Sequence, residues 1–182
     1  LLLALGFSKS DMANEFYDNE QYLFDSKTEK WKTKFNPENY KAKNFSEEVI
    51  DAKTGKVIIK LGEKINYLNA KKLSNEGLKD ILVSRESLFG KFLHSDINID
   101  ESETGVLKIG TELNDTIIQQ ILDANIHSIK IATTNSINKG PYLLLTILND
   151  KNNTKDEAIT EIYKMLRPGE PPTIEIATQI FN

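Results

Sequence analysis

The sequence contains no cysteine and only two histidines. Without cysteine the chain can form neither a disulfide bond nor a cysteine-ligated zinc site, and this composition suits a cytoplasmic protein. His94 and His127 lack the E-x-x-H or H-x-x-x-H spacing of zinc-binding histidines. A nucleophile elbow, a Walker loop and a dinucleotide-binding glycine pattern are also absent. We therefore predict no catalytic residue, no metal site and no small-molecule substrate for this chain.

An excess of positive charge is missing as well. The 23 lysines and arginines are outnumbered by 27 aspartates and glutamates, which gives a formal net charge of −4. Because phosphate neutralisation dominates nucleic-acid binding, we predict negligible affinity of the chain by itself for duplex DNA. Trp31 lies between two lysines and could stack on a base, but its alternating position in a hairpin pattern favours packing in the core.

Long hydrophobic runs are absent too. The opening LLLALGF is far shorter than the ~20 residues of a membrane-spanning helix and lacks the basic start of a signal peptide. We expect no membrane association. The run favours a helix cut through its apolar face, and IEIATQIFN at the other end is still in helical register. From both ends we expect a fragment of a larger protein.

Proline is scarce, yet three of the five prolines fall within LRPGEPPT, residues 166–173. Pro168 cannot continue a helical hydrogen-bond ladder, so the preceding helix must end at Arg167. Gly169 lets the chain reverse, and the proline pair after it stiffens the approach to Thr173, the next N-cap. The stretch predicts a rigid corner between two helices. The corner residues are Pro168, Gly169, Pro171 and Pro172.

Helices are predicted on both sides of the chain's middle. Before the corner, Thr154 is the expected N-cap of a helix. The apolar stripe of this helix is Ala158, Ile159, Ile162, Met165 and Leu166. Near the start, a helix is expected after Ser8 or Ser10. Its buried stripe would be Met12, Phe16 and Tyr17.

The sequence repeats itself between residues 51–97 and 100–147. Shifted by 48 positions, Gly77 meets Asn125, each just after a short amphipathic helix, where a C-terminal cap needs the left-handed conformation. After a two-residue slip, GKFLHSDI at 90–97 aligns with GPYLLLTI at 140–147. Each unit is predicted to run turn, strand, capped helix, strand, loop, strand. The other matched pairs are Gly62 with Gly110, Ile65 with Leu113, Leu73 with Ile121, Leu78 with Ile126, Ile81 with Ile129 and Val83 with Ile131.

The alternation of residues 22–35 around a polar centre predicts a hairpin before these repeats, followed by a loop. The fold class is therefore α+β, with helices at both termini flanking an α+β module built from two strand-helix-strand repeats. DESETG, residues 100–105, imitates the start of an EF-hand loop. Its twelfth position is Thr111 rather than a bidentate carboxylate, so a turn is the favoured interpretation.

The stretch EIYKMLRPGEPPT, residues 161–173, closely resembles a motif in the lobe of the bacterial RNA polymerase β subunit. LGFSKSDMANEFYD resembles the lobe helix that leads into a lineage-specific insertion. DAKTGKVIIKLGEKI, LSNEGLKDILV and NKGPYLLLTILND resemble segments of that insertion and its exit. The resemblance covers essentially all 182 residues, although it is specific at the proline motif and mostly one of pattern in the middle.

The resemblance implies lobe helices at 1–20 and 148–182 and an inserted module at 21–147. It implies a non-catalytic part of a DNA-directed RNA polymerase, a nucleotidyltransferase. The lobe would form one jaw of the downstream-DNA cleft, and the insertion would dock transcription regulators. The catalytic magnesium of that enzyme is held by β′, so no cofactor is expected here. Expected partners are the α, β′ and sigma subunits and DNA, in the cytoplasm at the nucleoid.

The resemblance also places two cations near DNA. Arg167 would contact DNA near the downstream fork, or else bond the terminal carbonyls of its own helix. Lys164 stands where the family often has arginine, so it keeps the charge but loses a bidentate phosphate contact. Two other functions stay open from the residues alone. One is a free-standing protein-interaction module with a duplicated α+β unit, and the other is an enzyme with an unrecognised site in a groove between the repeats.

Overall fold

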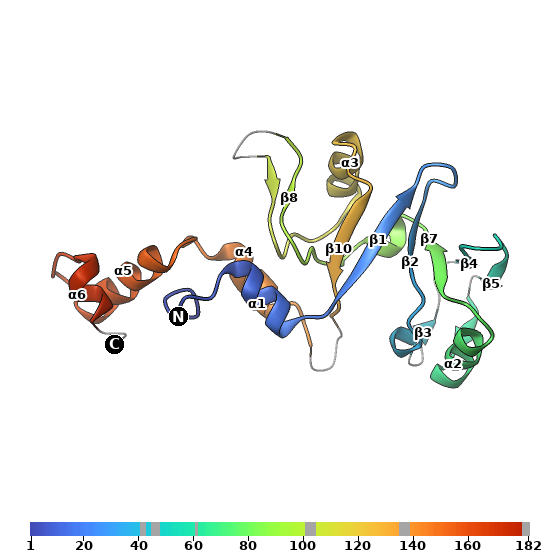
Figure 1. The fold of residues 1–182 in the computed structure, drawn as a ribbon, viewed down its shortest axis with the longest axis horizontal. Coiled ribbons are helices and arrows are strands. Elements are labelled where there is room, and N and C mark those ends of the chain that lie inside the picture. The colour runs from blue at the N-terminus through green and yellow to red at the C-terminus, as the bar shows by residue number, and fades with distance from the viewer. Residues whose placement is uncertain (41–42, 45–47, 61, 101–104, 135–138, 180–182) are drawn as a thin grey trace.

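The computed structural model describes residues 1–40, 43–44, 48–60, 62–100, 105–134 and 139–179. An antiparallel sheet of six strands, in the order β10-β1-β2-β7-β4-β5, forms one part of an elongated molecule (Figure 1). Its strands are β1 (Asn19–Asp25), β2 (Lys30–Lys34), β4 (Val49–Asp51), β5 (Val57–Ile59), β7 (Asp80–Val83) and β10 (Ser128–Ala132). Two short strand pairs lie outside it. They are β3 (Lys43–Asn44) with β6 (Lys64–Ile65), and β8 (Ile97–Asn98) with β9 (Val106–Leu107).

Helices accompany the sheet and form the other end of the molecule. The α-helices are α1 (Lys9–Phe16), α2 (Tyr67–Asn75), α3 (Asp115–Asp123), α4 (Tyr142–Asn149), α5 (Lys155–Leu166) and α6 (Ile174–Thr178), and the 3-10 helices are η1 (Pro37–Tyr40) and η2 (Glu86–Leu88). Figure 1 shows α5 and α6 at one end, α1 and α4 between them and the sheet, and α2 and α3 beside the sheet. The predicted mixture of helices and strands is confirmed. In the described ranges, no helix has the length and apolarity needed to cross a bilayer.

The hairpin predicted at residues 22–35 lies inside the sheet as β1 and β2. It places Phe24 opposite Trp31, with ring centroids 5.3 Å apart. Trp31 is fully buried, in a cluster that includes Leu93 and Ile118. The interpretation of Trp31 as a core residue is confirmed, and a ring so enclosed cannot stack on a base. The segment after the hairpin, predicted as a loop, contains η1 and β3.

The central hairpin is flanked by one strand from each predicted repeat. Strand β10 pairs with β1, and strand β7 pairs with β2. Helix α2 precedes β7 and helix α3 precedes β10. The two helices begin alike, because Asn66 and Asn114, 48 positions apart, are their N-caps. Each side chain accepts a hydrogen bond from the N–H three residues later, at 2.8 Å and 2.9 Å.

The two helices also end alike. Gly77 follows α2 with φ 106° and Asn125 follows α3 with φ 57°, so the predicted left-handed caps are confirmed. In each half the next residue, Leu78 or Ile126, donates its N–H to a carbonyl five residues back at 3.1 Å. The internal similarity therefore has a structural counterpart from the N-cap to the following strand. The limits of the repeats and of the module stay predictions.

The similarity also predicts a strand at 140–147, and this prediction is wrong, because this stretch begins helix α4. Leu144 and Ile147 lie three positions apart and are both buried, as a helix packed on one face requires. Pro141 stands at the N-cap, where a missing N–H removes no helical bond. In the first half, Phe92 and Leu93 make isolated bridges rather than a full strand.

The two ends of the chain pack together. One buried cluster joins Leu3 and Met12 with Ile159 of α5 and Ala177 of α6. Figure 1 shows the N-terminus close to α4 and α5. Distant parts of the sequence thus build one helical unit. The chain leaves this unit after α1, forms the sheet with its flanking helices, and returns to the unit at α4.

Helix α1 matches its prediction in part. Ser8 is the N-cap, in a capping box with Asp11. Met12 and Tyr17 are buried as predicted, whereas the prediction for Phe16 is wrong, because its side chain is 50% exposed. The inward positions of α1 are taken by Met12 and its neighbour Ala13.

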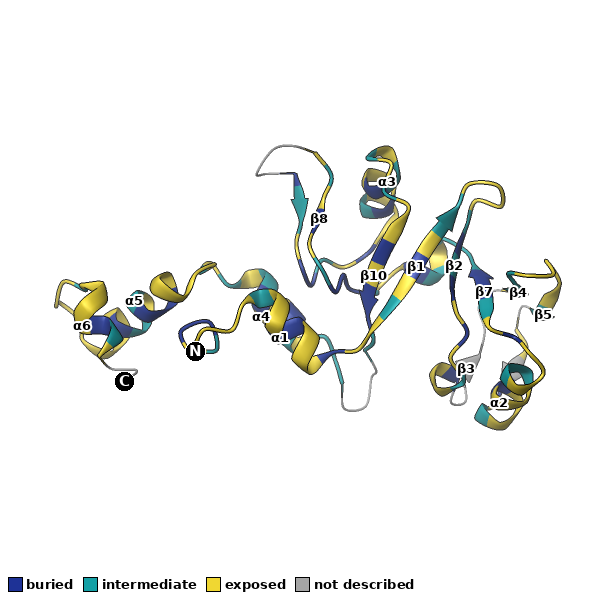
Figure 2. Cartoon of the chain, viewed as in Figure 1, coloured by how far each residue is buried: buried dark blue, intermediate teal, exposed yellow. Residues whose placement is uncertain are grey.

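Helix α5 begins at the predicted cap but is only partly covered. Thr154 is the N-cap in a capping box with the glutamate of N3. Ala158 and Ile159 are buried, whereas Met165 and Leu166, predicted in the same stripe, are 70% and 61% exposed. Figure 2 shows exposed residues prevailing towards the α5–α6 end. The last turn of α5 therefore extends beyond the cluster that covers its first turns.

Candidate functional site

The proline corner joins α5 to α6. Helix α5 stops at Leu166, and Arg167 is its C-cap, with its N–H donating to the Tyr163 carbonyl at 2.9 Å. Gly169 has φ 93°, in the left-handed region, as the reversal requires. Thr173 then caps α6 by accepting from the Ile176 N–H at 3.4 Å. The local path that the sequence predicts from Arg167 to Thr173 is confirmed.

Glu170 braces this corner, and sequence reasoning missed it. Its carboxylate accepts a hydrogen bond from the Tyr163 hydroxyl at 2.7 Å and contacts the Arg167 guanidinium at 3.4 Å. The Tyr163 bond, together with the Arg167 charge, lowers the pKa of Glu170. The same bond raises the pKa of Tyr163. The spacing in the sequence could have indicated this contact, because Glu170 lies three residues after Arg167, within the proline motif itself.

The two cations predicted from the resemblance to lie near DNA are on the last turn of α5 and at its C-cap. The Arg167 side chain is 57% exposed and is engaged by Glu170. Lys164 is exposed one turn earlier. Positive charge at the C-terminal end of a helix is favoured by the helix dipole. Among the described residues, no bond from the guanidinium to a helix carbonyl is present, so the arginine is oriented by a carboxylate that a phosphate would have to displace or share.

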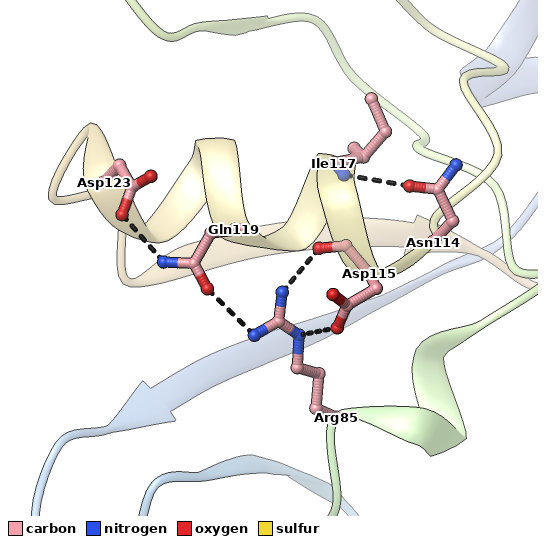
Figure 3. Close-up of polar contacts among 6 residues, drawn as sticks. All are labelled: Arg85, Asn114, Asp115, Ile117, Gln119 and Asp123. Carbon is pink, nitrogen blue, oxygen red and sulfur yellow. Dashed lines mark hydrogen bonds and ion pairs between the residues drawn. The ribbon is translucent and has the colours of Figure 1, made fainter.

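A second polar centre, which the sequence did not reveal, joins the two repeats (Figure 3). Arg85, just before η2, donates from Nη1 to Gln119 Oε1 at 3.0 Å, and its Nε lies 3.0 Å from Asp115 Oδ1. Its Nη2 donates to the Asp115 backbone carbonyl. Gln119 in turn donates to Asp123 at 2.7 Å. Arg85 thus fixes the segment between β7 and η2 in the first repeat against the first turn of α3 in the second.

A third polar group surrounds a buried phenol in the central sheet. The Tyr22 hydroxyl donates to Glu20 at 3.1 Å and accepts from Lys91 Nζ at 2.8 Å. The Lys91 ammonium also lies 4.9 Å from the centre of the Tyr22 ring. Burial, and then the Glu20 charge, raises the pKa of Tyr22 far above its usual value. Burial and the Glu20 charge keep the phenol protonated, so the hydrogen bonds satisfy a core residue and do not prepare a nucleophile.

No group of three or more histidine or carboxylate side chains suited to a metal ion occurs within the described part of the chain. Residues 101–104, which complete the EF-hand imitation, lie outside the described residues. The polar centres described above connect separate elements of the fold.

Comparison with known proteins supplies the identity. No family model matches the chain. The β subunits of DNA-directed RNA polymerase from Rickettsia conorii and Rickettsia felis are each 35% identical to it over 181 residues, which is all of this chain and 13% of the relative. The subunit from Dinoroseobacter shibae is 35% identical over 193 aligned positions, covering all of this chain and 14% of the relative. The chain is homologous to a segment of the RNA polymerase β subunit.

The β-subunit match confirms the resemblance carried by residues 161–173. It extends over the whole chain, so the repeats and both helical ends have counterparts in the β subunit. The chain spans about one eighth of the length of the curated relatives it matches. Homology along its full length disfavours the interpretation of a free-standing module unrelated to polymerase.

Proposed function

We propose that this segment serves DNA-templated RNA synthesis as a non-catalytic part of the polymerase β subunit. The helical ends, residues 1–20 and 148–182, belong to the lobe that forms one jaw of the downstream-DNA cleft. The module at 21–147 presents a docking surface to transcription regulators. The observation that carries the proposal is the match of the whole chain to β subunits of DNA-directed RNA polymerases.

The geometry supports this division of labour. The helical ends share one buried cluster, which suits a structural part of a jaw. The Tyr163, Arg167 and Glu170 contacts hold the corner at a defined angle. In this proposal Arg167 faces DNA near the downstream fork and Lys164 supports it. The partners are the α, β′ and sigma subunits and DNA, in the cytoplasm, and the catalytic magnesium belongs to β′.

Capture from native cell extract tests the proposal. An antibody raised against this chain is applied to a lysate of the source cell, and the captured polypeptide is sized and its companions identified by mass spectrometry. We expect a polypeptide several times larger than 20.6 kDa, accompanied by the α and β′ subunits. A polypeptide near 20.6 kDa without polymerase subunits would overturn the proposal in favour of a free-standing interaction module.

A further inference from the structure

The two similar stretches of the molecule carry opposite charge. Residues 52–79 contain seven lysines and two glutamates, a formal net charge of +5. Residues 100–127, displaced by the same 48 positions, contain six acidic residues and one lysine, a formal net charge of −5. Both stretches contain an asparagine-capped helix with a left-handed cap. Because the same capped helix is built within either charge, the charge is not required for that helix to form, and we take it to mark a surface specialised for binding.

The basic half contains a groove between strand β5 and helix α2, with a volume of about 250 Å³. The apolar side chains that line it are those of Ile58, Ile59, Ile65 and Leu73. Lys72 also lines the groove, and its side chain is 75% exposed. Lys60, exposed as well, directly follows β5. The groove therefore combines an aliphatic floor with Lys72, whose ammonium lies 3.8 Å from the Glu76 carboxylate, and Lys60 follows the strand that borders it.

The same groove borders the open side of the sheet. Strand β5 is the last of the six strands, and the described residues place no further strand of that sheet beyond it. Val57 on this strand is 43% exposed. An extended peptide can add to such an edge through main-chain hydrogen bonds while it places a side chain in an adjacent pocket.

We propose that the β5–α2 groove binds an extended acidic segment of a regulatory protein. One aliphatic side chain of that segment enters the groove, and its carboxylates face the lysines around β5 and α2. This inference rests on the proposed function, because it names the partner chemistry of the docking surface. The lysines concerned are Lys53, Lys56, Lys60 and Lys72.

The surroundings favour a polypeptide over a nucleic acid. Four of the eight described residues that line the groove are aliphatic and none is aromatic, whereas single-stranded nucleic acids are held by exposed aromatic rings on which bases stack. The nearby Tyr67 ring on α2 already has a cation beside it, because the Lys71 ammonium lies 5.9 Å from the centre of the ring. Glu63 and Glu76 also line the groove and would repel a continuous row of phosphates. A peptide can place its aliphatic side chain beside these glutamates and keep its carboxylates outside the groove, towards the lysines.

A binding measurement on assembled core polymerase tests this inference. The probe is a short fluorescent peptide of glutamate and serine with one central leucine, and duplex DNA fills the cleft so that the peptide cannot bind there. The test variant is Lys60→Glu with Lys72→Glu. The matched control is Lys108→Glu with Lys130→Glu, which makes the same change of charge on two exposed lysines of the second repeat.

We expect the test variant to raise the dissociation constant of the peptide about tenfold and the control to change it less than about twofold. Equal losses in both variants would overturn the inference, because the peptide would then sense only overall charge. Equal binding of a peptide with serine in place of leucine would also overturn it. So would an oligonucleotide that competes with the peptide and depends on the same two lysines, since the face would then bind nucleic acid.

The outcomes separate this inference from the proposed function. If the subunit carrying this segment does not assemble with α and β′, the proposed function fails and the inference fails with it. If polymerase assembles and transcribes, but the peptide binds the test and control variants alike, only the β5–α2 groove is rejected.

Discussion

At the residue scale, the contact with Glu170 sets the orientation of the Arg167 side chain. The carboxylate links the last turn of α5 to the chain after Gly169, through the Tyr163 hydroxyl and the Arg167 guanidinium. Prolines restrict the backbone of the corner, but they cannot orient a long side chain. Glu170 supplies that orientation, so corner geometry and arginine position are coupled.

The pKa of Glu170 gives a pH-dependent prediction. Because the folded pKa is lowered from 4.5, the ionised carboxylate stabilises the fold above that value. The contribution is lost as pH falls through the folded pKa. We expect Glu170→Gln to lower the melting temperature of the β subunit at neutral pH and to have no effect in strong acid. A difference of the same size at both pH values would show that lost packing, and not ionisation, causes the change.

Substitution of Arg167 tests the proposed contact with DNA. In assembled polymerase, we expect Arg167→Ala to weaken binding to downstream fork DNA and to reduce the slope of log affinity against log salt by about one. Arg167→Lys, which keeps the charge, should retain most of that slope. Lys155→Ala, at the opposite end of α5, is the control. An unchanged salt slope in Arg167→Ala would contradict a phosphate contact.

At the element scale, the caps of α2 and α3 show why the repeat is visible in the sequence. Both helices need an asparagine before them and a left-handed residue after them. Few residue types satisfy these positions, so a diverging pair keeps them while other positions change.

The cap after α2 provides a stability prediction. A Cβ added at Gly77 would meet no atom within 4 Å, so only the backbone conformation opposes it. We expect Gly77→Ala to lower the free energy of unfolding by about 1 kcal/mol, measured by urea denaturation. Asn125→Gly, at the equivalent place, should leave stability nearly unchanged, since φ 57° suits glycine. A neutral Gly77→Ala would mean that the end of α2 adopts another conformation.

Local features were predictable from the sequence, and features that depend on distant contacts were not. The proline corner, the caps at Ser8 and Thr154 and the central hairpin follow from short-range rules. The helix at 142–149 was missed because a short apolar run suits a buried strand as well as a helix. The Arg85 contacts with Asp115 and Gln119 join residues that are 30 or more positions apart in the sequence, so no local sequence pattern predicts them.

At the scale of the whole molecule, three buried clusters follow one another from the helical ends to the β5 edge. They are not independent. Phe92, Ile109 and Ala132 come from the module but belong to the cluster of the helical ends. Val83 packs against both clusters of the sheet. Each boundary is therefore bridged by side chains, and Arg85 adds a polar bridge between the repeats.

Such bridging predicts cooperative unfolding. We expect the isolated chain to melt in one sharp transition, with the same midpoint by circular dichroism and by fluorescence of its single tryptophan, Trp31. Different midpoints for the two probes, or a broad melt, would show that the clusters unfold separately.

The placement of the central hairpin has a consequence for how this segment can evolve. One copy of the repeat covers the outer side of β1 and the other covers the outer side of β2. A deletion that removed either copy would make β1 or β2, which carry the buried Tyr22 and Trp31, an edge strand in place of β10 or β5, and exposed apolar edges invite aggregation. We therefore expect lineages either to keep both copies or to lose both together with the hairpin that lies between them in the sheet. A subunit with only one copy would be prone to aggregation, and selection would act against it.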